Sequence, residues 1–263
     1  MIIRKSAREI EQMAEAGAIV ARTLELLAEH VRPGVTTGEL DRVADEFIRA
    51  HGGVPTFKGY RGYPASICTS PNDMVVHGIP GEHRLASGDI LSVDVGVTLG
   101  GFVGDSAYTF RVGEVSEEAD RLLAGCQAAL AAGIEQARPG NHIGDISAAV
   151  QRVTEEAGFS VVRSLVGHGV GRAMHEEPQI PNFGDPGRGP LLSEGMTFAI
   201  EPMINAGGPD VYLARDRWSI STEDGSLSAH FEHTVAVTAE GPRVLTLSNL
   251  PGMPRQPVVE RAA

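Results

Sequence analysis

Residues 91–107, LSVDVGVTLGGFVGDSA, decide how this chain folds, because they describe two apolar strands joined by a glycine-containing turn. Two carboxylates, Asp94 and Asp105, stand in this otherwise apolar stretch. If Leu99 and Gly100 form the centre of the turn, the two acids face each other with Cβ atoms about 4.5–5.5 Å apart. Like charges at that separation are destabilising unless a cation or a shared proton relieves them. The alternative is a register in which both acids lie on a solvent-exposed face.

Two more acids stand beside apolar segments in the second half of the chain. Glu201 ends the segment MTFAIE, and Glu232 precedes the segment HTVAV. An ionised carboxylate that is buried without a partner is very costly, so buried acids are normally paired or bound to metal. A single acid could belong to a structural salt bridge. Four acids at strand positions, with few Lys or Arg beside them, are better explained by divalent cations.

Three histidines lie in or near glycine-containing segments that follow apolar runs. His77 lies in VVHGIP, whereas His168 and His175 lie in SLVGHGVGRAMHEEP. Small neighbours permit close approach of the backbone and leave room for an open cavity. His233, directly after Glu232, either supports a metal ligand or is a satisfied core histidine. The histidines at positions 30, 51, 83 and 142 lie at expected helix ends or in loops and are interpreted as ordinary.

Four carboxylates with one or two imidazoles would form an oxygen-rich metal site. This composition suits Mn²⁺, Fe²⁺ or Co²⁺ and, less selectively, Zn²⁺. So many acids favour two ions about 3.5–4 Å apart, with carboxylates bridging them. Such a pair lowers the pKa of a bridging water and polarises a substrate carbonyl. The chemistry that the residues indicate is therefore metal-assisted hydrolysis.

The composition excludes several other classes of protein. The chain has 263 residues, of which 42% are hydrophobic, and a formal net charge of −12, which disfavours DNA binding. No apolar run approaches the roughly 18 residues of a membrane span, and the N-terminus has no signal-peptide core. The two cysteines form neither a disulfide framework nor a thiolate zinc site. We therefore expect a cytoplasmic protein without a membrane partner.

The hydrophobic pattern predicts alternating pairs of helices and groups of strands. Capping boxes at Ser6–Glu9 and Thr36–Glu39 each begin an amphipathic helix. Glycine at position 17, on the apolar stripe of the first helix, would let a neighbour pack closely. Two later helices and five strand regions are expected at 117–136, 145–157, 65–70, 89–111, 160–166, 196–204 and 231–245.

A short internal repeat relates the two halves of the chain. LASGDILSVD at 85–94 and LSEGMTFAIE at 192–201 share Leu, Gly, an aliphatic residue and a final acid at an offset of 107 residues. The repeat indicates two related α/β halves packed around one shared sheet. No Pro/Ser-rich linker divides the chain, so we expect a single domain over 1–250. Residues 251–263, with three prolines and no periodicity, are expected to form a loosely held tail.

In order and context, five of these residues resemble the metal ligands of the methionine aminopeptidases. They are Asp94 in SVDVG, Asp105 in GFVGDSA, His168 in GHGVGR, Glu201 in AIEPM and Glu232 in FEHT. VVHGIP and MHEEP resemble two further active-site histidine motifs of that family. The resemblance extends from about residue 3 to 247 and implies the pita-bread fold. This is a curved antiparallel sheet flanked by helix pairs with pseudo-two-fold symmetry, of the α/β (α+β) class.

The resemblance implies a role for each residue. Asp94 would bind the second of two divalent ions, Co, Mn, Fe or Zn, while Asp105 and Glu232 would bridge both. His168 and Glu201 would complete the coordination of the first ion. His77 and His175 would be catalytic, because they would hydrogen-bond the scissile amide and the tetrahedral intermediate.

The family's methionine pocket corresponds to several residues near the histidines. Tyr60, Tyr63, Cys68 and Trp218 would surround the thioether, together with Met174 and the two catalytic histidines. The tyrosines could instead only anchor a glycine-rich loop, and Cys68 could be a small core residue. Two residues depart from the family pattern. Met174 stands where many relatives carry an aromatic residue, and His230 stands where glutamine is usual.

The implied activity is removal of the initiator methionine from nascent chains whose second residue is small, through a metal-activated bridging water. The partners would be N-terminal methionyl peptides, with transient ribosome contact as a further option, and we expect a monomer. The chain resembles a compact bacterial type I enzyme. One alternative is an Xaa-Pro peptidase, which shares the fold and ligands but usually has an additional N-terminal domain. A metal-free binding module of the same fold is the other alternative.

Overall fold

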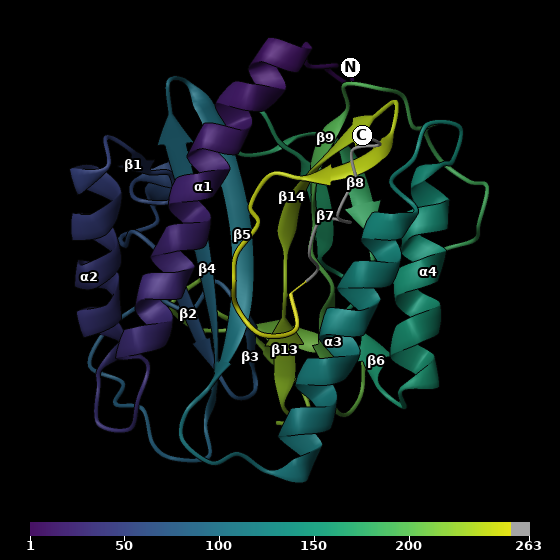
Figure 1. Cartoon of the computed structure of the whole chain (residues 1–263). Helices are drawn as coiled ribbons and strands as arrows, with labels where there is room; N and C mark the ends of the chain where they lie inside the picture. Colours follow the sequence, from purple (N-terminus) through teal and green to yellow (C-terminus); the bar gives the residue numbers. More distant parts are fainter. Residues whose placement is uncertain (254–263) are drawn as a thin grey trace, which may run out of the picture.

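The structure of this protein is a computed structural model that describes residues 1–253. Its two halves each consist of strands covered by a pair of helices, as Figure 1 shows. The helices are α1 (Ala7–His30), α2 (Thr37–Ala50), α3 (Glu117–Glu135) and α4 (Ile143–Glu156), with a one-turn 3₁₀-helix at Tyr60–Gly62. The strands of the first half are β1 (Val54–Pro55), β2 (Cys68–Pro71), β3 (Met74–Val76), β4 (Ile90–Leu99) and β5 (Phe102–Arg111).

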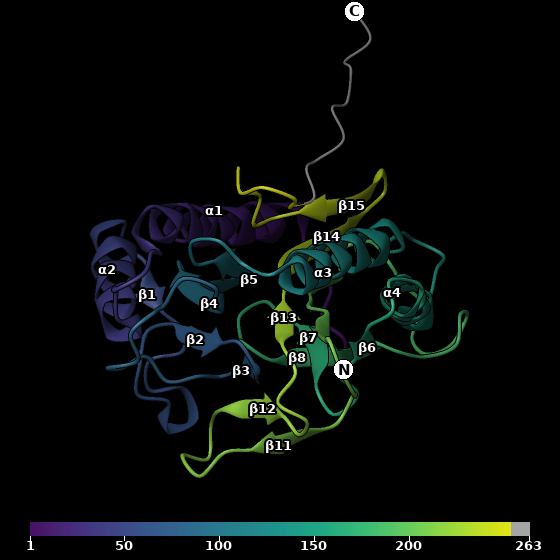
Figure 2. The ribbon, with the colours of Figure 1, turned by 90° about the horizontal axis from the view of Figure 1, so that it is seen from below.

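The second half contains ten further strands. They are β6 (Ser160–Val161), β7 (Val166–Gly169), β8 (Glu176–Pro181), β9 (Thr197–Ile200), β10 (Met203–Asn205), β11 (Val211–Leu213), β12 (Ile220–Thr222), β13 (Ser228–His230), β14 (His233–Thr238) and β15 (Gly241–Val244). All their pairings are antiparallel, and the largest sheet has the order β15-β14-β9-β7-β8. Figure 2 shows α1 and α3 on one side of the strands, with β11 and β12 on the other.

The predicted helices are present, and the predicted strands are shorter and more numerous than expected. Both capping boxes form as expected, because Ser6 and Thr36 each accept a hydrogen bond from the backbone of the glutamate three residues later. The predicted strand at 196–204 is interrupted at Glu201–Pro202, between β9 and β10. The predicted strand at 231–245 is the hairpin of β14 and β15. No helix within residues 1–253 is long and apolar enough to cross a membrane.

The β4–β5 hairpin has a different register from the one expected. Leu99 pairs with Phe102, so the two-residue turn is Gly100–Gly101, and both glycines have positive φ angles of 57° and 82°. Positive φ at both central residues is what a type I′ hairpin turn requires. Asp94 therefore lies opposite Ala107, and the expectation that it directly faces Asp105 is wrong. The shift is two residues, an even number, so both acids stay on the same face.

Glycines allow helix α1 to lie against strand β5. A Cβ atom on Gly17 would lie 2.1 Å from the backbone oxygen of Leu245, and one on Gly104 would lie 2.7 Å from the backbone nitrogen of Gly17. The close packing expected at Gly17 is therefore confirmed. Gly104 lets the backbones of α1 and β5 come together next to Asp105, and Gly17 lets the backbone of Leu245 approach the helix.

The internal repeat corresponds to a structural repeat. Gly88 and Gly195, equivalent in the two copies, have φ angles of 102° and 87°. Each donates its backbone N–H within its own half, Gly88 to the backbone oxygen of Val112 just after β5 and Gly195 to that of Val237 in β14. The strands that follow, β4 and β9, each lead to an acid of the repeat. These matching hydrogen bonds make the two halves equivalent around the centre of the molecule.

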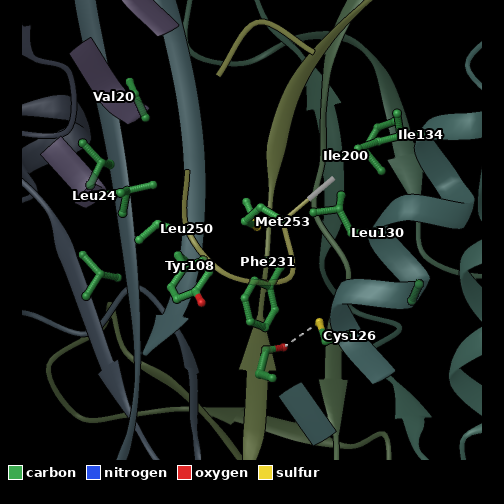
Figure 3. Packing of buried hydrophobic residues seen from close by; sticks show 14 of the residues in the cluster. Val20, Leu24, Tyr108, Cys126, Leu130, Ile134, Ile200, Phe231, Leu250 and Met253 are labelled. Atoms are coloured by element: carbon green, nitrogen blue, oxygen red, sulfur yellow. Dashed lines mark hydrogen bonds between the residues drawn. The ribbon is translucent and has the colours of Figure 1, made fainter. Parts of the chain in front are cut away.

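The core extends across both halves. Figure 3 shows Val20 and Leu24 of α1 and Leu130 of α3 around the central Phe231. The chain after β15 contributes to the same cluster through Leu250 and Met253, which are 6% and 4% exposed. The expected tail begins at residue 251, and its remaining residues, 254–263, lie outside the part that the structure describes.

Candidate active site

A single cavity of about 280 Å³ contains all twelve residues that the sequence suggested for the site. The cavity lies where the two halves meet. Its carboxylates and imidazoles come from β4, β5, β7, β13 and the segments after β3, β7, β9 and β13. The predicted residues that line it are Tyr60, Tyr63, Cys68, His77, Asp94, Asp105, His168, Met174, His175, Glu201, Trp218 and Glu232.

The four acids form one cluster, in which Asp105 and Glu232 are buried and Asp94 and Glu201 are partly buried. Asp105 and Glu232 are 2% and 1% exposed, and their carboxylate oxygens lie within 4.8 Å of each other and of a ring nitrogen of His168. The carboxyl groups of Asp94 and Glu232 also lie close enough to Asp105 to influence its pKa. Three of the four residues each have a carboxylate oxygen that is buried without a hydrogen-bond partner, namely Oδ1 of Asp94, Oδ1 of Asp105 and Oε1 of Glu232.

This crowding changes the acidity of the carboxyl groups. Burial and the nearby charge of Glu201 raise the pKa of Asp105 to about 8. Burial likewise raises the pKa of Glu201 to about 8. Burial and the charge of Asp105 raise the pKa values of Asp94 and Glu232 well above the ordinary range. Without a cation the cluster therefore retains protons near neutral pH, whereas a divalent cation would stabilise its ionised form.

His168 presents a free ring nitrogen to the acids. Its Nδ1 lies 3.0 Å from the backbone oxygen of Gly169, an acceptor that places the ring proton on Nδ1. Its Nε2 lies 3.7 Å from Oδ2 of Asp105 and 3.5 Å from Oε1 of Glu201. Burial lowers the pKa of His168 to about 4, so the ring is neutral at pH 7. A neutral imidazole with a free Nε2 is the form that binds a metal ion.

The other two predicted histidines lie on the wall of the cavity. Burial lowers the pKa of His77 to about 4 and also lowers the pKa of His175. The hydroxyl of Tyr60 lies 2.9 Å from Nδ1 of His175, and the two rings stack with centroids 5.5 Å apart. The His175 ring also lies against that of His168, with centroids 4.2 Å apart. His175 is thus fixed next to the acid cluster.

Aromatic and sulfur-containing side chains form the apolar part of the cavity. The hydroxyl of Tyr63 donates to the backbone oxygens of Ile67 and Gly78, so this tyrosine also anchors the neighbouring chain. Trp218 meets the Tyr63 ring edge to face, with centroids 5.1 Å apart. Burial and the charge of Asp94 raise the pKa of Cys68 well above its ordinary value, so its thiol is neutral. A polarisable apolar side chain fits these neighbours.

Several lining residues were absent from the predicted site. Apolar neighbours such as Phe57, Leu165 and Met203 gave no signal, because apolar residues are common in core positions throughout the chain. His230 also lines the cavity. It ends β13, two residues before Glu232, and both side chains line the cavity.

Comparison with known proteins shows what this chain resembles. The family model described as metallopeptidase family M24 matches residues 11–239. A methionine aminopeptidase of Clostridium perfringens is 53% identical over 94% of this chain and 99% of its own length. Methionine aminopeptidase 1 of Bacillus subtilis is 50% identical over the same shares.

The fold has a solved counterpart. The crystal structure of methionine aminopeptidase from Rickettsia prowazekii matches with a TM-score of 0.93 and 44% identity, over 94% of this chain and all of that chain. The expected pita-bread architecture of helix pairs around antiparallel strands is thereby confirmed.

Proposed function

The chain belongs to metallopeptidase family M24, and on that basis we propose that it removes N-terminal methionine from proteins whose second residue is small. The observation that carries the proposal is the acid cluster. Ligand atoms of Asp105, His168 and Glu232 lie within 4.8 Å of one another there, and three carboxylate oxygens of the cluster are buried without a hydrogen-bond partner. Its chemistry suits divalent cations, because hard carboxylate oxygens and one imidazole are the donors that Mn²⁺, Fe²⁺, Co²⁺ and Zn²⁺ accept.

Five residues would hold two divalent ions in this site. They are Asp94, Asp105, His168, Glu201 and Glu232. Asp105 and Glu232 would be the residues shared between the ions, since each offers an oxygen within 4.8 Å of the other and of a ring nitrogen of His168. Divalent ions, when bound there, would polarise the scissile carbonyl and lower the pKa of an attacking water. Loading would also ionise the carboxyl groups, since a cation reverses the rise in pKa caused by burial.

His77 and His175 would act on the peptide itself. Both rings are neutral at pH 7, so each has one N–H donor and one acceptor nitrogen. When the Tyr60 hydroxyl donates to Nδ1 of His175, the ring proton of His175 resides on Nε2. An N–H held in this way can donate to the carbonyl oxygen as negative charge develops on it, which stabilises the transition state.

The pocket for the methionine side chain would be formed by Tyr60, Tyr63, Cys68, Met174 and Trp218. Sulfur–aromatic contacts favour a thioether there, and the neutral thiol adds no charge. The substrates would be the N-terminal methionyl peptides of nascent chains. The protein would act on them in the cytoplasm as a monomer that contacts the ribosome transiently.

A two-substrate assay tests this function. We expect the purified protein, supplied with Co²⁺ or Mn²⁺, to hydrolyse Met-Ala-Ser and to lose that activity when a chelator is added. It should leave Xaa-Pro dipeptides intact. Preferential cleavage of Xaa-Pro would instead identify an Xaa-Pro peptidase. Failure to bind either metal or cleave either substrate would favour a binding module.

A further inference from the structure

His230 is a cavity residue that has no role in the proposed reaction. Its side chain is 2% exposed, and its Nε2 is buried without a hydrogen-bond partner. It ends strand β13, whose central position in the molecule is seen in Figure 2. A buried polar atom without a partner is costly, so its presence next to a metal-binding cluster requires an explanation.

Glu201 lies between two imidazoles that are arranged in the same way. Its Oε1 lies 3.5 Å from Nε2 of His168, and its Oε2 lies 3.5 Å from Nε2 of His230. At 3.5 Å both separations exceed the usual range of a hydrogen bond. They are close to the roughly 3.4 Å between two donors that share a tetrahedral ion at about 2.1 Å from each.

The repeat gives His230 the same position in its half as Asp105 has in the other. The repeat of 85–94 and 192–201 makes Asp94 and Glu201 equivalent. Asp94 pairs with Ala107, and Glu201 is opposite Glu232 when the β14–β9 register is continued one step past Ile200–His233. Two residues earlier on each strand stand Asp105 and His230. The second half thus has a histidine at the position where the first half has a proposed bridging ligand.

The backbone contacts of these two residues are also equivalent. The hydroxyl of Thr234 accepts from the N–H of Asp105 and donates to its C=O, at 3.0 and 2.8 Å. The hydroxyl of Thr109 accepts from the N–H of His230 and donates to its C=O, at 3.0 and 2.8 Å. One threonine hydroxyl therefore holds each residue in place from the opposite half, and both side chains line the same cavity.

We propose that His230 is a sixth metal-binding residue, which donates Nε2 to an ion that Glu201 also binds. The proposal rests on the proposed function, because it assumes that the acid cluster binds divalent metal. A metal ion would provide the partner that Nε2 lacks. Glu201 would then bind through both oxygens, one on the side of His168 and the other on the side of His230. A purely structural role would instead have Nε2–H donating to Glu201 and no bond between His230 and metal.

Counting metal-bound histidines in the Co²⁺-loaded protein separates these roles. An imidazole bound through Nε2 retains a proton on Nδ1, and paramagnetic Co²⁺ shifts that exchangeable proton far outside the normal ¹H NMR range. We expect two such resonances in the wild type. One should disappear in His230→Gln and the other in His168→Gln, whereas the exposed control His83→Gln should keep both. A single strongly shifted resonance in the wild type, retained in His230→Gln, would overturn the proposal.

Calorimetric titration of the metal-free proteins with Co²⁺ gives a second readout. In His230→Gln, Co²⁺ affinity in one of the binding steps should fall by at least about tenfold. Removing a residue that only supports a metal ligand already costs about that much, so loss of a ligand should cost no less. His83→Gln should titrate like the wild type. Unchanged affinity in a folded His230→Gln protein would contradict the proposal.

If His230→Gln does not fold, the number of shifted resonances in the wild-type spectrum still tests the proposal. If the wild type binds no Co²⁺ and leaves Met-Ala-Ser intact, the proposed function fails as well. If it binds Co²⁺ and cleaves the peptide but has one metal-bound histidine, only the role of His230 fails.

Discussion

The side chain of Thr234 makes both backbone hydrogen bonds of Asp105, accepting from its N–H and donating to its C=O. Asp105 belongs to the first half and Thr234 to the second, so this contact is part of the junction between the halves. It positions a proposed metal ligand without touching the carboxylate. We therefore expect residues that lack any contact with substrate or metal to affect both stability and metal affinity.

Thr234→Val should destabilise the protein because it removes this hydroxyl and keeps the side-chain shape. Two buried backbone groups of Asp105 lose their partner, and an unsatisfied buried group costs about 1–3 kcal/mol. We expect a loss of that order in the free energy of urea unfolding and weaker Mn²⁺ binding. Thr69→Val is a matched control, because the Thr69 hydroxyl is buried without a partner. Equal stability of the two variants would show that the Asp105 contact contributes nothing.

Gly17→Ala should separate helix α1 from the chain that follows β15. The added Cβ would lie 2.1 Å from the backbone oxygen of Leu245, an atom that cannot rotate away. Overpacking of this kind typically costs about 1–3 kcal/mol. The comparison is with Gly81→Ala, where a Cβ would meet nothing within 4 Å. A thermal unfolding midpoint as high in Gly17→Ala as in Gly81→Ala would refute the close contact.

Asp105→Asn should have opposite effects on the metal-free and metal-loaded protein. Removing one acid from a crowded buried cluster relieves repulsion. The free energy of unfolding of the metal-free variant at pH 8 should therefore be at least as high as that of the wild type. The rise in melting temperature on addition of Mn²⁺ should be largely lost, together with nearly all turnover. Asp120→Asn, which breaks only an exposed pair with Arg111, should leave the Mn²⁺ effect intact. Near-normal activity in Asp105→Asn would rule out a bridging role.

The metal-free protein should lose stability as pH rises from about 6.5 to 8. The pKa values of Asp105 and Glu201 are about 8 in the folded protein, against about 4 in unfolded chains, so the folded state binds more protons in this window. Stability falls with pH wherever the folded state binds more protons than the unfolded state. His77 and His168, with folded pKa values of about 4, have the opposite effect, but mainly below pH 6.5.

Urea unfolding of chelated protein across this pH range measures the effect. Saturating Mn²⁺ should remove the decline, because a bound cation keeps the carboxylates ionised. A chelated protein whose stability is constant or increases between pH 6.5 and 8 would contradict the raised pKa values.

Local sequence signals predicted the helices better than the pairing of strands. The capping boxes at Ser6 and Thr36 depend only on neighbouring residues, and both form as expected. The hairpin turn is centred on Gly100–Gly101 and not on Leu99–Gly100 as expected. Both central residues of this turn need a positive φ, which glycine adopts readily and Leu99 does not. The face of Asp94 and Asp105 was still predictable, since an even shift preserves it.

The site residues that were missed depend on long-range packing. Phe57 and Met203 line the cavity only because distant segments meet there, and nothing in their own surroundings in the sequence indicates it. His230 could have been found from its spacing to Glu232. Its equivalence to Asp105 depends on the register of two strand pairs. The short repeat at 85–94 and 192–201 includes neither residue, so it could not predict this equivalence.

Tyr60→Phe should reduce turnover by removing the hydroxyl that lies 2.9 Å from Nδ1 of His175. Phenylalanine keeps the stacking with the His175 ring, so the histidine stays in the cavity but loses the partner that sets its tautomer and orientation. We expect kcat for Met-Ala-Ser to fall by about tenfold, less than the roughly 10²–10³ typical of losing a transition-state hydrogen-bond donor. His175→Ala, which removes that donor, should reach the larger range. An unchanged kcat in Tyr60→Phe would show that the hydroxyl does not position His175, and a loss as large as that of His175→Ala would give Tyr60 a direct role in catalysis.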